Sequence, residues 1–245
     1  MPNELSLALL IFAAAVLYSS VGHAGASGYL AAMALYDVAP AEMKPTALVL
    51  NILVATVATF RFYSAGSFSW RVFLPFACAS VPFAFVGGQM VLPNPVYRQV
   101  VGATLLVAAF RLFTHSPPRD GKGLRRLPPA VGVACGAVIG LLSGLTGVGG
   151  GIYLTPLLLF THWADTRQAA GVSAAFILVN SVAGLAGHSL ATRTLPHALP
   201  LFALAAVAGG LIGSTLGSRR LGSPAFRRVL GVVLVIAAAK MLFAR

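Results

Sequence analysis

Apolar residues run along this chain in long blocks, separated by short stretches rich in proline, glycine and polar residues. Ten blocks can be distinguished: Leu5–Val21, Ala24–Tyr36, Glu42–Tyr63, Arg71–Leu92, Val96–Thr114, Pro129–Thr146, Gly149–Phe160, Gln168–Ser189, His197–Gly217 and Ala225–Phe243. A helix needs roughly 20 residues to cross the hydrocarbon core of a bilayer. The second and seventh blocks are shorter than that, and we predict that they form half-helices.

The composition identifies these blocks as membrane-spanning. Hydrophobic residues make up 58% of the chain and charged residues only 9%, whereas about a quarter of the residues of a soluble protein are charged. The residues before Leu5 include no basic side chain, whereas a cleaved signal peptide begins with a positively charged segment. The first block is therefore expected to be a retained helix. Cys78 and Cys135 lie in apolar segments without redox or metal-ligand spacing, and we expect no disulfide. The predicted fold is an all-α polytopic membrane protein.

The two halves of the chain resemble each other. The segment 95–102 (PVYRQVVG) corresponds to 224–231 (PAFRRVLG). The segment Ser143–Pro156 (SGLTGVGGGIYLTP) has a near copy in 19–30 (SSVGHAGASGYL), which aligns Gly25 with Gly149. We therefore predict a first repeat over 1–114, a basic linker over 115–128 and a second repeat over 129–245, with five helical segments in each repeat.

The glycine-rich segments mark predicted breaks in the helices. Each glycine inside a helix costs roughly 1 kcal/mol relative to alanine, so the run Gly149–Gly151 should interrupt the helix that begins near Pro129. Non-helical backbone persists within a membrane only where protein buries it or where it lines a cavity. The helix that follows each break presents free N–H groups and a partial positive charge, which suit an anion. The alternative is that these glycines serve only the close packing of helices.

The positions of the basic residues favour one orientation in the membrane. If the half-helices cross, five of the 17 Lys and Arg residues lie on one side: Lys44, Arg98, Arg193, Lys240 and Arg245. The other twelve gather on the opposite side: Arg61, Arg71, Arg111, Arg119, Lys122, Arg125, Arg126, Arg167, Arg219, Arg220, Arg227 and Arg228. Re-entrant half-helices give a weaker asymmetry, so the positive-inside rule favours crossing. The linker is then cytoplasmic, both termini are periplasmic, and the two repeats are inverted.

The net charge of +12 requires no nucleic acid as a partner. Cytoplasmic basic residues next to a membrane contact anionic lipid headgroups. Membrane lipid is therefore an expected partner, and a homodimer stays open as an alternative to a monomer.

An inverted repeat would bring the two breaks together near the middle of the membrane. Many secondary transporters bind an anionic group there, between the N-termini of discontinuous helices. The candidate substrate-binding residues in the breaks are Ser19, Ser20, His23, Gly25, Ser27, Ser143, Thr146, Gly147, Gly149, Gly150 and Gly151. Asn51 and Asn180 lie within long apolar blocks, where a hydrogen bond between helices is the first interpretation and substrate contact the second. His23 is interpreted either as a structural hydrogen-bonding residue or as a group that holds an anion or a proton.

Enzymatic function is not expected. The sequence has no H-E-x-x-H motif, no G-x-S-x-G nucleophile elbow and no cluster of carboxylates in its apolar blocks. It also lacks a Walker motif, which argues against ATP-driven pumping. No cofactor or metal is predicted.

Residues 140–159, GLLSGLTGVGGGIYLTPLLL, together with their degenerate first-half counterpart, resemble the TauE/SafE family of membrane permeases, the sulfite exporters. The family's glycine motif maps onto Gly144, Gly147, Gly149–Gly151 and Pro156. The first half departs from the pattern at His23, Ala26 and Ser27. The resemblance implies export of sulfite, or of an organosulfonate such as sulfoacetate, across the inner membrane. An anion channel and an uptake permease for another small oxyanion are the alternatives.

Overall fold

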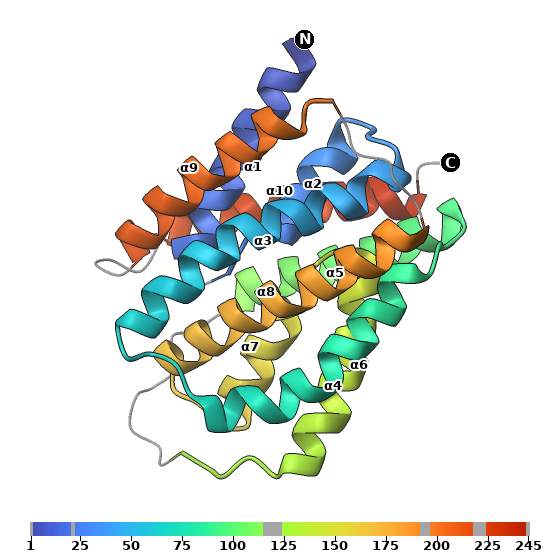
Figure 1. The fold of residues 1–245 in the computed structure, drawn as a ribbon. Helices are drawn as coiled ribbons and strands as arrows, with labels where there is room; N and C mark the ends of the chain where they lie inside the picture. The colour runs from blue at the N-terminus through green and yellow to red at the C-terminus, as the bar shows by residue number, and fades with distance from the viewer. Residues whose placement is uncertain (1, 21–22, 115–123, 192–196, 218–223, 244–245) are drawn as a thin grey trace.

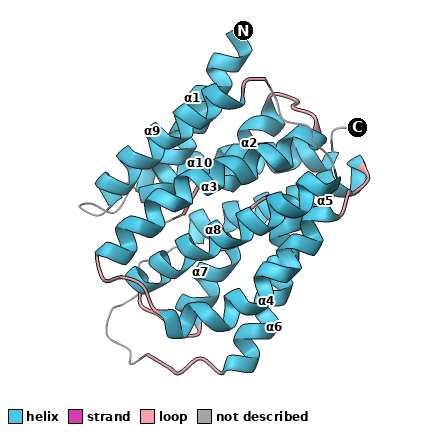
Figure 2. Cartoon of the chain, viewed as in Figure 1, coloured by secondary structure: helices cyan, strands magenta, loops and turns pink. Residues whose placement is uncertain are grey.

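The computed structural model describes residues 2–20, 23–114, 124–191, 197–217 and 224–243. The described residues form ten α-helices joined by loops (Figures 1 and 2). The first five are α1 (Pro2–Ser20), α2 (Ala26–Leu35), α3 (Pro40–Ser64), α4 (Trp70–Gln89) and α5 (Asn94–Thr114). The second five are α6 (Pro129–Thr146), α7 (Gly151–Phe160), α8 (Thr166–Ala191), α9 (Leu199–Gly217) and α10 (Pro224–Phe243). Each of the ten apolar blocks coincides with one helix, so the predicted all-α fold is confirmed.

The lengths of the helices support a multi-pass membrane protein. Among the described residues, four helical segments are long and apolar enough to span a membrane: Pro40–Ser64, Trp70–Gln89, Pro129–Thr146 and Thr166–Ser189. α2 and α7 each contain only 10 residues, which at 1.5 Å per residue gives about 15 Å, roughly half of a hydrocarbon core. Their predicted shortness is confirmed.

The helices of the two halves are interleaved. α1 of the first half packs against α9 of the second, and α6 of the second packs against α4 of the first. α3 lies beside α8 and α5 beside α10. Figure 1 shows α3 and α8 running in opposite directions. Exchanging the halves converts the α1–α9 pair into the α6–α4 pair and leaves the other two pairs unchanged, as a two-fold relation requires. The inverted repeat itself stays a prediction.

Several glycines outside the breaks serve close packing. A Cβ atom on Gly140 would lie 2.3 Å from the carbonyl oxygen of Ser80, and one on Gly144 would lie 2.1 Å from that of Ala84. On α9, a Cβ atom on Gly213 would lie 2.2 Å from the carbonyl oxygen of Val16. No side chain fits at these distances, so the α4–α6 and α1–α9 pairs depend on glycine. The packing interpretation is therefore correct for Gly144.

Part of the charge pattern used to predict the orientation lies outside the described residues. This applies to Arg119, Lys122, Arg193, Arg219, Arg220 and Arg245. At the described end of the linker, Arg125 and Arg126 are exposed. The Arg125 backbone N–H donates to the carbonyl of His162, 2.8 Å away, in the turn after α7. The linker end is thus fixed to the second repeat.

Candidate functional site

The second break is built from left-handed glycines. α6 ends at Thr146, and Gly147, Gly149 and Gly150 then take φ angles of 84°, 79° and 82°. An L-residue in this region costs roughly 1–2 kcal/mol, so the glycines allow the chain to leave one helix and start another within four residues. The Gly147 N–H donates to the Ser143 carbonyl at 2.9 Å and closes α6. α7 then begins at Gly151, and the predicted break is confirmed.

Side chains from distant helices hold the second break in place. The Asn51 side-chain amide on α3 donates to the Gly147 carbonyl at 3.3 Å. The Tyr97 hydroxyl on α5 donates to the Thr146 carbonyl at 3.2 Å. The last carbonyls of a helix have no partner within it, and these two bonds satisfy two of them. The hydrogen-bonding interpretation of Asn51 therefore fits one of its two polar atoms.

The first break is held mainly by its own neighbours. α1 ends at Ser20, and α2 begins after Gly25, whose φ is 104°. The His23 backbone N–H donates to the Tyr18 carbonyl at 2.9 Å. The Ser27 hydroxyl donates to the Tyr18 hydroxyl at 2.6 Å, and the Tyr29 hydroxyl donates to the Ala24 carbonyl. These bonds lie within α1, α2 and the segment between them.

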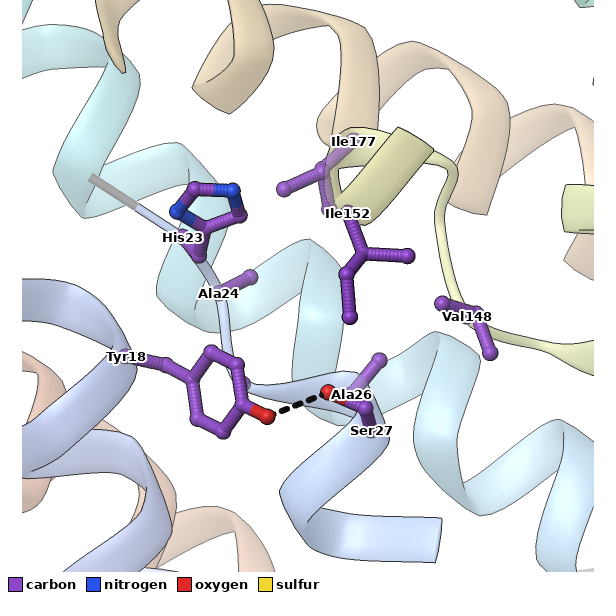
Figure 3. Close-up of a pocket in the computed structure, with 9 residues that line it drawn as sticks. Tyr18, His23, Ala24, Ala26, Ser27, Val148, Ile152 and Ile177 are labelled. Atoms are coloured by element: carbon purple, nitrogen blue, oxygen red, sulfur yellow. Dashed lines mark hydrogen bonds between the residues drawn. The ribbon is translucent and has the colours of Figure 1, made fainter. Parts of the chain in front are cut away.

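The two breaks meet at a small cavity, shown in Figure 3. Its lining is Tyr18, His23, Ala24, Gly25, Ala26 and Ser27 on the first-break side, and Val148, Ile152 and Ile177 on the other. The cavity has room for about one water molecule. Breaks that are more than 120 residues apart in the sequence thus face each other, but the space between them is closed to an anion the size of sulfite.

A chain of hydrogen bonds links the first break to the second repeat. His23 Nε2 lies 3.0 Å from the Thr155 hydroxyl on α7, and that hydroxyl lies 2.7 Å from the Ser173 hydroxyl on α8. This geometry agrees with the hydrogen-bonding interpretation of His23. It also places an ionisable ring between the segment that joins α1 to α2 and the helix α7, which is bonded in turn to α8.

Several of the predicted site residues are buried with polar atoms that have no hydrogen-bond partner among the described residues. These atoms include the hydroxyls of Ser19 and Ser143, Asn51 Oδ1, and both side-chain polar atoms of Asn180. Each such atom costs about 1–3 kcal/mol and requires an explanation, such as a ligand that binds transiently.

Other predicted residues do not contribute a free polar group. Ser20 donates to the Leu17 carbonyl at 2.7 Å and Thr146 to the Leu142 carbonyl at 2.7 Å, each within its own helix. A Cβ atom on Gly150 would lie 2.8 Å from the Phe176 ring, and one on Gly151 would lie 2.4 Å from Ile177. These two glycines face apolar side chains.

Gly149 faces two polar side chains beside an apolar one. A Cβ atom on Gly149 would lie 2.8 Å from Ile177 Cγ2, 2.9 Å from Asn51 Nδ2 and 3.2 Å from the Ser181 hydroxyl. The backbone at Gly149 therefore lies against the polar groups of α3 and α8.

Four residues that the fold brings to the breaks were not predicted from the sequence: Tyr97, Thr155, Ser173 and Ser181. Thr155 lies within the glycine motif, one turn after Gly151, and that spacing was a usable signal. Ser173 and Ser181 carry no signal in the sequence, because only the packing of α8 decides which of its hydroxyls are buried.

The charges of the site suit an anion. Among the described residues, the buried ones that can carry a positive charge are Lys44 and His188, and no Asp or Glu is buried. In the same part of the chain, no group of three or more His, Cys, Asp or Glu side chains is placed to hold a metal ion. The polar groups offered to a ligand are hydroxyls, amides and backbone N–H groups.

Comparison with known proteins also indicates membrane transport. A model of the family described as Sulfite exporter TauE/SafE matches residues 7–241. Probable membrane transporter protein y4hK of Sinorhizobium fredii is 40% identical over 244 residues, which cover 98% of this chain and 99% of that protein. Probable membrane transporter protein YunE of Bacillus subtilis is 22% identical over 229 residues, 84% of this chain and 82% of that protein. No solved structure matches the chain significantly.

Proposed function

The chain belongs to the sulfite exporter TauE/SafE family of membrane transport proteins, and from this premise we propose that it is a secondary transporter for a small sulfur-containing anion. The substrate is sulfite or an organosulfonate such as sulfoacetate. Export proceeds across the inner membrane by alternating access. The family and the names of its relatives indicate transport and not catalysis.

The observation that carries this proposal is the meeting of the two breaks. The half-helices α2 and α7 both begin at this point, and each helix N-terminus supplies about half an elementary charge. Hydroxyl and amide groups without partners lie on the helices around them. A sulfite or sulfonate group has three oxygens that accept hydrogen bonds, and the breaks offer donors with no buried carboxylate to repel the anion.

The small size of the cavity supports alternating access. The cavity holds about one water molecule, so an anion binds only after the helices around the breaks move apart. His23 is bonded across the breaks to Thr155 on α7. A movement that separates the two breaks would break this hydrogen bond. The bond is therefore a candidate for a contact that differs between the two states.

A binding screen tests the substrate class. The purified protein is titrated with sulfite, sulfate, thiosulfate, sulfoacetate and taurine, and its melting temperature is followed, because a ligand that binds only the folded state raises it. We expect stabilisation by sulfite or sulfoacetate. Stabilisation by none of the five would contradict the proposal.

A flux assay tests the mechanism. In proteoliposomes, a gradient of the stabilising anion should drive protons or a second ion uphill, and the flux should saturate. Conductance that rises almost linearly with anion concentration and moves no second ion would identify a channel instead.

We also propose that the linker is cytoplasmic and that both termini are periplasmic. Cys78 and Cys135 are free thiols and are first replaced by alanine. A cysteine is then placed at Glu4, which precedes the first apolar block, or at Arg126, both of which are exposed. An impermeant reagent added to the periplasmic side should label position 4 but not position 126. The reverse result would overturn the orientation.

A further inference from the structure

Lys44 is a buried cation whose partners are backbone carbonyls. Its side chain is only 5% exposed, and its amine donates to the carbonyls of Gly88 at 2.9 Å, of Gly87 at 3.2 Å and of Met90 at 3.2 Å. These carbonyls form the C-terminal end of α4, which carries about half a negative charge. Among the described residues, the ion pair that the fold makes is Lys240 with Asp37, and Lys44 has no carboxylate partner.

A whole positive charge is therefore balanced by only part of a negative one. A buried charge is costly unless it is paired. The three α4 carbonyls accept all three N–H donors of the amine and reduce this cost, but an anionic oxygen forms a stronger, charge-assisted hydrogen bond with an amine than a neutral carbonyl does. An anion that displaced one of these carbonyls would therefore bind the amine more strongly than the carbonyl does.

Lys44 lies directly beside the second break. A Cβ atom on Gly147 would be 3.0 Å from the Lys44 carbonyl oxygen and 3.2 Å from its Cα atom. Asn51, whose amide binds the Gly147 carbonyl, stands seven residues further along α3. Residues spaced by seven share a face of a helix, and at 1.5 Å per residue they are about 10 Å apart. This face of α3 therefore connects the buried amine with the break.

A second basic side chain approaches the same place from α8. His188 is also buried, with 7% exposure. It lies one turn after Gly184, and a Cβ atom on Gly88 would be 2.2 Å from the Gly184 carbonyl. The C-terminal end of α4 binds the Lys44 amine. The same end therefore packs closely against the turn of α8 that precedes His188.

We propose that Lys44 and His188 form an anion-binding site on the substrate path, separate from the cavity between the breaks. A small oxyanion bound there takes the place of the α4 carbonyls as the partner of the Lys44 amine. The end of α4 is thereby released from α3. The inference rests on the proposed function, because it assumes that the transported ligand is an oxyanion.

The chain contains a matched control for this role. The Lys240 amine also caps a helix end, since it donates to the Leu35 carbonyl at 2.9 Å at the end of α2. It differs in having a carboxylate partner, Asp37 Oδ2 at 2.6 Å. A purely structural capping lysine should behave alike at both positions, whereas an anion site should be sensitive only at Lys44.

The test measures sulfite and sulfate affinity of the purified full-length protein by calorimetry, together with its melting temperature. Lys44→Met should weaken binding roughly ten- to hundredfold, the equivalent of one hydrogen bond to a charged group. Lys44→Arg keeps the charge and should bind within a few-fold of the wild type. Lys240→Met should lower the melting temperature and leave both affinities unchanged.

Three outcomes would overturn the site. Folded Lys44→Met protein with wild-type affinity would make Lys44 a helix cap only, and an equal loss of affinity in Lys240→Met would indicate general destabilisation. If Lys44→Met does not fold, His188→Gln replaces it, with an expected several-fold loss of affinity, and unchanged affinity there would refute the site. A wild-type protein that binds no oxyanion would instead refute the proposed function, before any variant is compared.

Discussion

The two helix breaks align in sequence but are stabilised differently. The first contains one left-handed glycine, Gly25, among its described residues, and its side-chain bonds join α1 to α2. The second contains three left-handed glycines, and its carbonyls are held by Asn51 and Tyr97 from helices far away in the sequence. Apart from the bond between His23 and Thr155 on α7, the first break is stabilised locally, whereas the second depends on side chains from helices distant in the sequence.

This difference explains why the glycine motif is degenerate in the first half. Aligning Gly25 with Gly149 places Ala26 opposite Gly150. Ala26 is already the first residue of α2 and tolerates a side chain, whereas Gly150 is still left-handed with a φ of 82°. In this alignment α7 begins one residue later than α2, so the residue at that position in the second break is still outside a helix and, with its positive φ, must be glycine.

Gly150→Ala gives the second break the residue that the first has, and we expect it to have the largest effect. The new Cβ atom would be 2.8 Å from the Phe176 ring. Overpacking costs about 1–3 kcal/mol, and the positive φ adds roughly 1–2 kcal/mol. We expect a marked fall in melting temperature and loss of transport.

Gly66→Ala is the control for that variant, because Gly66 has a φ of 68° but open space around it. It should show only the backbone cost and normal transport. Equal effects of the two substitutions would mean that the tight packing at Gly150 has no role.

Asn51→Ala and Asn180→Ala should separate a structural amide from one available to a ligand. Asn51→Ala leaves the buried Gly147 carbonyl without its partner, at a cost of about 1–3 kcal/mol in the free energy of unfolding. Asn180→Ala removes two polar atoms that have no partner, so the melting temperature should stay the same or rise while anion affinity falls. Strong destabilisation by Asn180→Ala with normal affinity would make that residue structural.

Tyr97→Phe should loosen only the second break. It removes a hydrogen bond worth about 0.5–1.5 kcal/mol from the Thr146 carbonyl. In a background without Cys78 and Cys135, a cysteine in place of the buried Val148 should become more reactive toward thiol reagents. Tyr29→Phe, which removes the bond to the Ala24 carbonyl in the first break, should leave that reactivity unchanged, and an equal increase would argue against separate support of the two breaks.

His23→Gln should have the smallest effect, limited to the charge preference of transport. A protonated imidazole supplies positive charge that glutamine cannot supply, so the variant should reduce the flux of sulfite several-fold more than that of a singly charged sulfonate. An equal reduction of both fluxes would leave His23 with only its bond to Thr155.

The sequence by itself determined the elements of this protein. The ten helices, the two short ones and the break after Thr146 follow from apolar blocks and glycine runs, because helix formation and positive φ angles are decided by neighbouring residues. The resemblance to the family can also be seen in the sequence, because the glycine motif is one continuous stretch, residues 140–159.

Only the tertiary structure decided which polar atoms meet. Asn51 and Asn180 are the same residue type at matching positions in the sequence, yet within the described part of the chain one binds a carbonyl and the other has no partner. Lys44 counted in the sequence only as a charge near a helix end, and the fold buries it against α4. The pairing of α3 with α8 and of α4 with α6 fixes these contacts, because a buried polar group takes whatever partner the packing of helices distant in sequence brings within reach.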